Sequence, residues 1–164
     1  MSAEGQRHPV DVVAELLADS GRSLATAESC TGGMLGAALT SVAGASSWYR
    51  GGAIVYDDAL KRSLAGVSEA TLTDHGAVSM EVARELAAGI RRRCSADIGI
   101  GITGIAGPGG GSEDKPVGLV HLAIDDDRGS LHYELRLIGD RERVRRQTVA
   151  VALDRLRRRL LEDA

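Results

Sequence analysis

Hydrophobic positions along the chain alternate between helix-like and strand-like segments. Apolar residues spaced three and four apart predict helices over residues 9–19, 31–42, 79–94 and from 141 onward, and a shorter helix that carries Lys61. Short apolar runs predict strands over residues 23–27, 52–56, 97–103, 117–124 and 131–138. Because helices link the early strands and a short segment joins the last two, we expect an α/β fold. It has three α/β/α layers around a mixed, mostly parallel sheet with a late antiparallel hairpin.

Local signals refine some of these elements. The strands over 52–56 and 97–103 are expected to be buried. In the second of them Ile alternates with Gly, which indicates that other backbone comes close. Polar residues that are expected to cap predicted helices are Asp57 or Asp58, Ser79 and Asp140.

Length and composition fit one domain with an aliphatic core. The 164 residues are 43% hydrophobic and only 2% aromatic, with no Phe. We expect a single domain over residues 9–164 after a disordered tail over residues 1–8. The core must then be built from Leu, Val, Ile and Ala.

Charge and cysteine content disfavour several classes of protein. The formal net charge of −3 argues against a nucleic-acid binder, which usually shows a strongly basic face. The first ten residues lack the apolar stretch of a signal peptide, and the uncharged segment 29–49 is too rich in Gly, Ser and Thr for a membrane span. We therefore expect a cytoplasmic protein in which Cys30 and Cys94 are reduced thiols.

A serine stands at the predicted bend between the first strand and the second helix. Ser29 is followed by Thr31, Gly32 and Gly33, and glycines permit a tight turn there. The first N–H groups of a helix lack partners within it, so they can bind a phosphate, a carboxylate or the oxyanion of an acyl-transfer intermediate. Ser29 is therefore a candidate nucleophile. The alternative is that Ser29 or Thr31 only caps the helix.

A serine nucleophile needs a base, and no histidine is well placed to serve. His8 lies in the tail and His75 in a predicted loop, whereas His121 and His132 lie in the late hairpin as surface or packing residues. Lys61 and Lys115 are the only lysines among 20 basic residues, and a desolvated lysine, unlike an arginine, can release its proton.

Lys61 is thus the candidate base. Tyr56, which ends the preceding strand, is a candidate to relay the proton or hold the serine hydroxyl. The alternative is a solvated helix lysine and a surface tyrosine.

A glycine-rich loop follows the strand over 97–103. Its start matches G-x-G-x-x-G, but Pro108 and the many glycines forbid the helix that a dinucleotide site requires. The loop could still wrap a substrate with backbone amides from Gly104 and Gly107, and Thr103 would point its hydroxyl into that site. The alternative is a mobile loop without a ligand.

Basic residues cluster where the last helix begins. Acidic residues interleave with them, so most of the run is expected on a solvated face. One arginine at the helix start, Arg141 or Arg145, is a candidate to bind a phosphate. Without a Cys/His cluster, we expect no metal site.

Four ordered blocks of the chain resemble one protein family. The blocks run from Thr26 to Gly33 (TAESCTGG), from Tyr49 to Tyr56 (YRGGAIVY) with Lys61, from Gly101 to Gly110 (GITGIAGPGG) with KPVGL at 115–119, and from Gly139 to Arg145 (GDRERVR). They are similar to the motifs of the CinA C-terminal domain family, the PncC-type nicotinamide-nucleotide amidases. The resemblance extends from about Val10 to Leu160.

The resemblance implies hydrolysis of nicotinamide mononucleotide to nicotinic acid mononucleotide and ammonia, without a cofactor. It implies Ser29 as nucleophile, Lys61 as base, Tyr56 as its helper and Thr103 as a residue of the substrate pocket. It also implies a three-layer α/β/α fold and a homodimer or larger homo-oligomer. Many relatives carry an additional N-terminal domain, and we expect any pyrophosphatase activity tied to it to be absent.

Two other functions fit the same residues. One is a non-catalytic module that binds pyridine nucleotides, and the other is an amidase for a different carboxamide.

Overall fold

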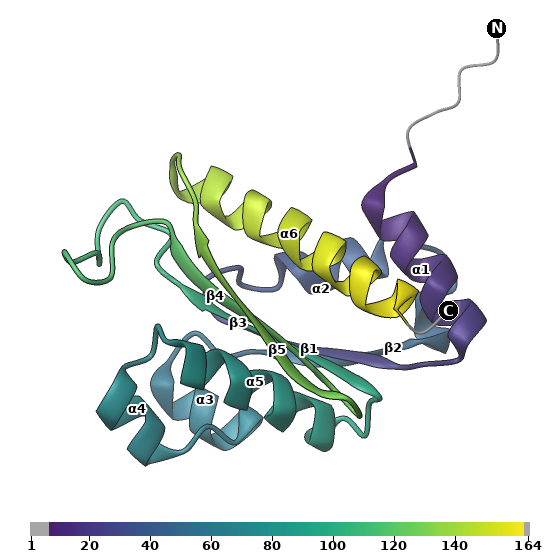
Figure 1. Ribbon diagram of the computed structural model, residues 1–164, viewed down its shortest axis with the longest axis horizontal. Helices are drawn as coiled ribbons and strands as arrows, with labels where there is room; N and C mark the ends of the chain where they lie inside the picture. Colours follow the sequence, from purple (N-terminus) through teal and green to yellow (C-terminus); the bar gives the residue numbers. More distant parts are fainter. Residues whose placement is uncertain (1–6, 163–164) are drawn as a thin grey trace, which may run out of the picture.

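The computed structural model describes residues 7–162, which form a mixed five-stranded sheet between two layers of helices (Figure 1). The strands are β1 (Leu24–Glu28), β2 (Tyr49–Ile54), β3 (Ile98–Gly104), β4 (Leu119–Asp126) and β5 (Gly129–Arg136). The helices are α1 (Pro9–Ser20), α2 (Met34–Thr40), the 3₁₀ helix η1 (Ala45–Ser47), α3 (Asp58–Ala65), α4 (Glu69–His75), α5 (Met80–Arg93) and α6 (Arg141–Leu161). The predicted tail over 1–8 lies mostly outside the described residues.

The strand order is β2-β1-β3-β4-β5. β1 pairs in parallel with both β2 and β3, whereas the β3–β4 and β4–β5 pairs are antiparallel. The predicted fold class is therefore confirmed, including the late hairpin, which turns between Asp126 and Gly129.

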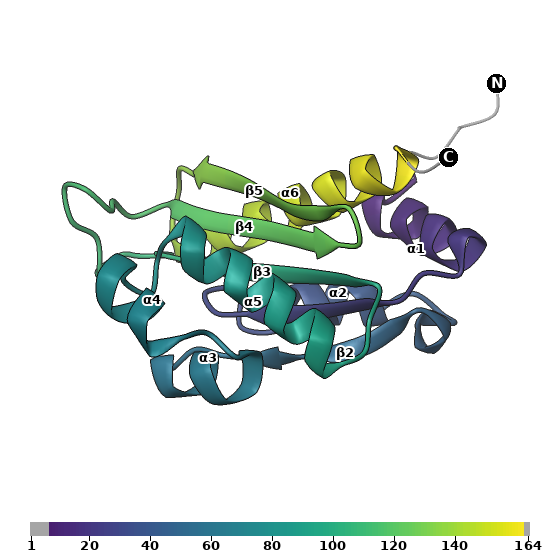
Figure 2. The ribbon, with the colours of Figure 1, turned by 60° about the horizontal axis from the view of Figure 1, so that its bottom comes forward.

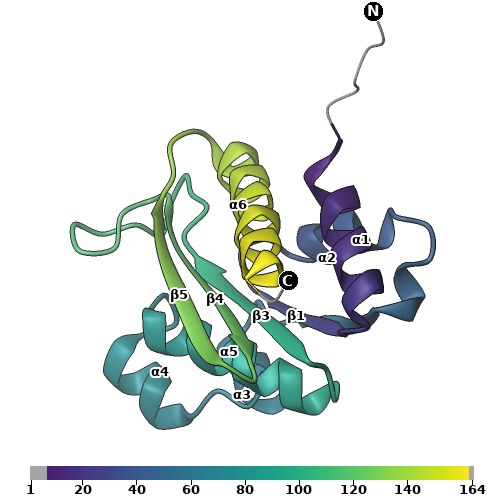
Figure 3. The same ribbon diagram turned by 45° about the vertical axis from the view of Figure 1, so that its right-hand side comes forward.

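Helices α1, α2 and α6 cover one face of the sheet and α3, α4 and α5 cover the other, as the rotated view shows (Figure 2). α6 runs beside α1 over the first face (Figure 3). Ile98, Ile100 and Ile102 of β3 pack into the larger core cluster on this side. Aliphatic side chains supply most of both main clusters, as the composition predicts.

The glycines of β3 let α5 lie directly against the sheet. A Cβ at Gly99 would stand 2.1 Å from the Ala87 carbonyl oxygen, and one at Gly101 would stand 2.3 Å from that of Ala83. The expectation that other backbone approaches this strand closely is confirmed.

Three local predictions are wrong. The second strand spans Tyr49–Ile54 and is not buried: it is an edge strand paired only with β1, and Ile54 is 53% exposed. α2 begins at Met34 rather than residue 31, because Gly32 and Gly33 adopt φ values of 57° and 96° outside the right-handed helical region. His75 is not in a loop but ends α4, a helix that the hydrophobic pattern did not reveal.

The predicted caps are found. Asp57, Ser79 and Asp140 accept hydrogen bonds from the backbone N–H groups of Ala59, Val82 and Arg143 respectively. Asp57 is thus the cap of α3, which leaves the side chain of Asp58 for another contact.

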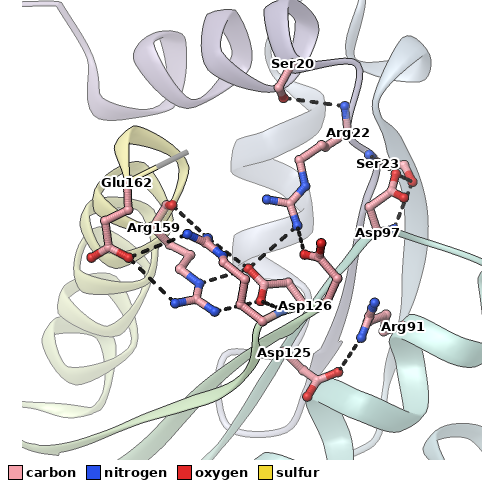
Figure 4. A network of polar contacts seen from close by, with 11 residues as sticks. Ser20, Arg22, Ser23, Arg91, Asp97, Asp125, Asp126, Arg159 and Glu162 are labelled. Atoms are coloured by element: carbon pink, nitrogen blue, oxygen red, sulfur yellow. Dashed lines mark hydrogen bonds and ion pairs between the residues drawn. The ribbon is translucent and has the colours of Figure 1, made fainter. Parts of the chain in front are cut away.

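The buried carboxylate of Asp126 binds the end of α6 to the β4–β5 hairpin through ion pairs and hydrogen bonds (Figure 4). The Asp126 side chain is fully buried, and Arg159 donates to its two oxygens at 2.8 and 2.6 Å. Arg128 adds a hydrogen bond at 3.0 Å. Burial alone would raise the pKa of Asp126, but these hydrogen bonds hold it well below its usual range.

Within residues 7–162, no helix is both long and apolar enough to cross a membrane.

Candidate active site

The candidate site lies at the carboxyl edge of the parallel strands. The order of the strands reverses at β1: β2 is added on one side of it and β3 on the other, and the helices that follow β1 and β2 cover opposite faces. Ligands bind at such switch points in open α/β sheets. Ser29 follows β1, Tyr56 follows β2, and Thr103 lies near the end of β3.

The turn at Ser29 is tightly anchored. Its backbone N–H donates to the Ile102 carbonyl at 3.0 Å, and its carbonyl accepts from the Gly32 N–H at 3.0 Å. The left-handed conformation of Gly32 and Gly33 then sends the chain into α2. The Ser29 side chain forms no hydrogen bond with another residue in the range 7–162.

Glu28 fixes this turn from behind. Its carboxylate, 2% exposed, accepts hydrogen bonds from the N–H groups of Gly33, Leu35 and Gly36 at 3.1, 3.1 and 2.8 Å. The sequence predicts that the backbone N–H groups of residues 31–33 are free to bind an oxyanion or a phosphate. That is wrong for Gly32 and Gly33, whose N–H groups are already used.

The N–H groups of Cys30 and Thr31 donate to no oxygen within the part of the chain that the structure describes. Thr31 is fully buried, so Cys30 is the one of these two residues that borders the cavity described below.

Lys61 is buried at the start of α3. Its side chain is 3% exposed, and its ammonium group donates to the Asp58 carboxylate at 3.1 Å and to the Tyr56 carbonyl at 3.2 Å. It forms no hydrogen bond with Ser29. The expectation of a desolvated lysine is met, and the alternative of a solvated helix lysine is not.

Ser29 and Lys61 line the same cavity of about 190 Å³. Four other predicted site residues also line it: Tyr56, Thr103, Gly104 and Arg141. The remaining wall consists of Cys30, Asp58, Ala77, Val78 and Ala106. No histidine lines this cavity, so Lys61 is the side chain in its wall best suited to act as a base.

Arg141 bridges the cavity mouth. It donates to the Tyr56 hydroxyl at 2.9 Å and to the Gly107 carbonyl at 2.8 Å, so it joins the first residue of α6 to the glycine-rich loop. Tyr56 is 61% exposed, and its hydroxyl contacts Arg141 rather than Ser29.

The other predicted residues lie around the cavity rather than in its wall. Arg145 donates to the carbonyls of Cys30 and Thr31 at 3.1 and 3.0 Å, which braces the turn from α6. The Thr31 hydroxyl is buried without a hydrogen-bond partner among the described residues. Gly32 and Gly33 shape the turn, and Gly107 contributes its carbonyl to Arg141.

Comparison with known proteins places this architecture in a family. The model of the CinA C-terminal domain matches residues 7–160. The chain belongs to the CinA C-terminal domain family. Its relatives include a CinA-like protein of Acidobacterium capsulatum, 55% identical over 141 residues that make up 86% of this chain and 34% of that protein. Another is a CinA-like protein of Synechococcus elongatus, 51% identical over 92% of this chain and 36% of that protein.

This CinA domain thus spans about a third of the length of the curated relatives that it matches. Solved structures match it over nearly their whole length. A competence/damage-inducible protein of Agrobacterium tumefaciens is 41% identical with a TM-score of 0.86, covering 95% of this chain and 97% of that one. A CinA superfamily protein of Klebsiella pneumoniae is 36% identical with a TM-score of 0.90, covering 95% and 99%.

Sequence reasoning missed two chemically important residues of the CinA site. Asp58 was considered only as a cap, although it stands three residues before Lys61 and so on the same helix face. Cys30 was considered only for its redox state, yet it lines the cavity. Burial raises the pKa of its thiol to about 11, so Cys30 is a protonated wall residue at neutral pH and not a competing nucleophile.

Proposed function

We propose that this CinA domain is an amidohydrolase that converts nicotinamide mononucleotide to nicotinic acid mononucleotide and ammonia through a Ser–Lys acyl-enzyme mechanism. One observation carries the proposal: a serine at a strand-to-helix turn and a buried lysine from a different helix line one small cavity. The resemblance of the four motifs supports the choice of substrate.

In the proposed reaction, Lys61 in its neutral form takes the proton of the Ser29 hydroxyl, and the oxygen attacks the carboxamide carbon. The N–H group of Cys30, a residue of the cavity wall, is the candidate donor for the oxyanion. The protonated Lys61 then passes its proton to the amide nitrogen, and ammonia leaves. Water, activated by the same amine, cleaves the acyl-enzyme and releases the acid and free Ser29.

The cavity dimensions fit the reacting end of such a substrate. About 190 Å³ is below the roughly 300–1,000 Å³ of pockets that enclose a whole drug-sized ligand. We therefore place the pyridine carboxamide inside and the ribose and phosphate at the mouth. Arg141 lies there, and its guanidinium is the candidate partner of the phosphate.

Ammonia release from the mononucleotide by the purified protein tests this proposal. Ser29→Ala should lower the rate by roughly 10³-fold or more while the protein keeps its melting temperature. Release at the wild-type rate by this variant would disprove the nucleophile. Binding without turnover by the wild-type protein would instead favour a non-catalytic nucleotide-binding module.

A panel of other carboxamides, compared by kcat/KM, tests the identity of the substrate. A riboside or simple amide hydrolysed more efficiently than the mononucleotide would retain the amidase and replace its substrate. The homodimer or larger assembly implied by the resemblance and the cytoplasmic location expected from the sequence remain predictions, and analytical ultracentrifugation measures the first.

A further inference from the structure

Two adjacent aspartates open α3, and they have different partners. The Asp57 side chain caps the helix by accepting a hydrogen bond from the Ala59 N–H at 2.8 Å. Asp58 is the first helical residue and directs its carboxylate to Lys61, with 3.1 Å between the oxygen and the amine nitrogen. Residues of the same charge, one position apart, therefore differ in whether they contact the proposed base.

The contacts of Lys61 leave one direction open. An ammonium group has three protons to donate. Two are directed to the Asp58 carboxylate and the Tyr56 carbonyl, which both belong to the segment just before α3. The third position on the nitrogen is left for the cavity that Ser29 also lines.

We propose that Asp58 is a positioning residue for the reaction, which orients the Lys61 amine toward Ser29 and stabilises the ammonium formed when that amine takes the serine proton. The proposal rests on the proposed function in that Lys61 acts as the base. It follows the general arrangement in which the base of a nucleophile is oriented by a third group. The proton that leaves Ser29 resides on Lys61 beside the carboxylate until the leaving group takes it.

Among the described residues that line the cavity, Asp58 is the only anion. Besides Asp58 and Lys61, the charged or titratable side chains that line it are Cys30, Tyr56 and Arg141, and the Cys30 thiol is protonated at neutral pH. Arg141 donates to Tyr56 and Gly107 rather than to Asp58. The Asp58 side chain is 60% exposed, so solvent screens its charge and moderates the expected effect.

The test compares Asp58→Asn with Asp57→Asn. Both variants remove one negative charge, and asparagine caps a helix as well as aspartate does. The first readout is the rate at which phenylmethylsulfonyl fluoride modifies Ser29 across a pH series, followed by mass spectrometry. In that reaction the serine oxygen bonds to sulfur, fluoride leaves and the serine proton passes to Lys61. The second readout is kcat for the mononucleotide over the same pH range.

We expect Asp58→Asn to lower the plateau of both rates at least about tenfold. The ascending limb should also move to lower pH, because the carboxylate that favours the protonated amine is gone. Asp57→Asn should match the wild type, and Asp58→Glu should restore the wild-type profile at least in part.

The outcomes separate the two proposals. Ser29 could be modified with the slower rate and shifted pH profile predicted for Asp58→Asn, while no protein turns over the mononucleotide. That result would support the role of Asp58 and overturn the proposed substrate. Profiles for Asp58→Asn that match those of Asp57→Asn, or a lower rate with an unchanged pH profile, would overturn the role of Asp58. A wild-type protein whose Ser29 is not modified at any pH would overturn both.

Discussion

At the scale of single residues, the candidate site contains a buried lysine, Lys61, that forms an ion pair with one carboxylate among the described residues. Lysine is seldom buried unless it is paired, and here the pair is with the half-exposed Asp58. We expect Lys61→Arg to lower turnover by roughly 10³-fold or more, because a guanidinium keeps the positive charge and the ion pair but cannot serve as a base. Ammonia release measures the loss of turnover, and thermal melting shows whether the arginine variant remains as stable as the wild type. Substantial turnover by the arginine variant would show that Lys61 acts only through its charge.

The cavity cysteine gives a second prediction at this scale. Because burial raises the pKa of Cys30 to about 11, very little thiolate is present at pH 7.5. Iodoacetamide should therefore modify the partly exposed Cys94 well before Cys30 in the folded protein, and peptide mass spectrometry can follow both. Equal rates for the two residues in native protein, compared with a urea-denatured control, would contradict the burial of Cys30.

The sequence could reveal some of these residues but not others. Lys61 stood out because lysine is rare in this chain. The sequence could not distinguish Asp57 from Asp58, since either could cap the helix. In the structure Asp57 is the cap and Asp58 contacts the Lys61 amine. The amides of Gly32 and Gly33 were misassigned because the Gly32 N–H donates to the Ser29 carbonyl, and the Gly33 N–H donates to Glu28, which precedes the turn.

At the scale of elements, the Glu28 carboxylate is one of the groups that hold the strand–turn–helix unit around Ser29. Glu28→Gln offers one acceptor oxygen and places an NH₂ group against backbone N–H donors, so the turn should shift. We expect kcat to fall roughly ten- to hundredfold with little change in KM, because misplacement of a nucleophile by about 1 Å has such an effect.

Thr26→Val is the matched control for this variant. It removes another hydrogen bond of the same strand, the 2.7 Å contact between the Thr26 and Tyr49 hydroxyls. It should lower the melting temperature without altering kcat. Equal losses of kcat in both variants would indicate general destabilisation rather than positioning of Ser29.

Elements with a clear apolar face were predictable, and elements without one were not. α4 buries none of its residues and is held at its start by the Ser68 cap, so no hydrophobic stripe marks it. The strand predicted over 52–56 has an apolar composition, but β2 spans Tyr49–Ile54 and lies at the sheet edge. The position of a strand in a sheet depends on pairing that a local pattern does not encode.

At the scale of the whole molecule, the fold class followed from the alternation of elements, whereas the location of the site did not. The sequence predicts Ser29 and Lys61 each at the start of a helix. Their meeting depends on β1 lying between β2 and β3 with the following helices on opposite faces. The order of the strands in the sheet therefore brings Ser29 and Lys61, which are far apart in the sequence, to the wall of one cavity.

The stability of the whole molecule in acid depends on Asp126, because this residue connects α6 to the β4–β5 hairpin. Its pKa is lower in the folded state than the ordinary carboxyl value of 3.8, so its contribution to stability is complete above that value and is lost as pH falls below it. The lowered pKa values of His121 and His132, caused first by burial, act in the same direction but at higher pH, below their ordinary value of 6.5.

Comparison of the wild type with Asp126→Asn isolates the carboxylate from the histidines, which both proteins retain. At pH 7 the variant should lose about 3 kcal/mol of unfolding free energy, because Arg159 loses its contact with a fully buried carboxylate. This difference should shrink as pH falls below the ordinary carboxyl value of 3.8, because the carboxyl of the unfolded chain becomes protonated there while the folded one still holds its charge. Urea denaturation over a pH series measures it, with Asp127→Asn as an exposed neighbour of the same charge. A difference that stays constant as pH falls well below 3.8 would show that Asp126 stabilises the fold through its shape and not its charge.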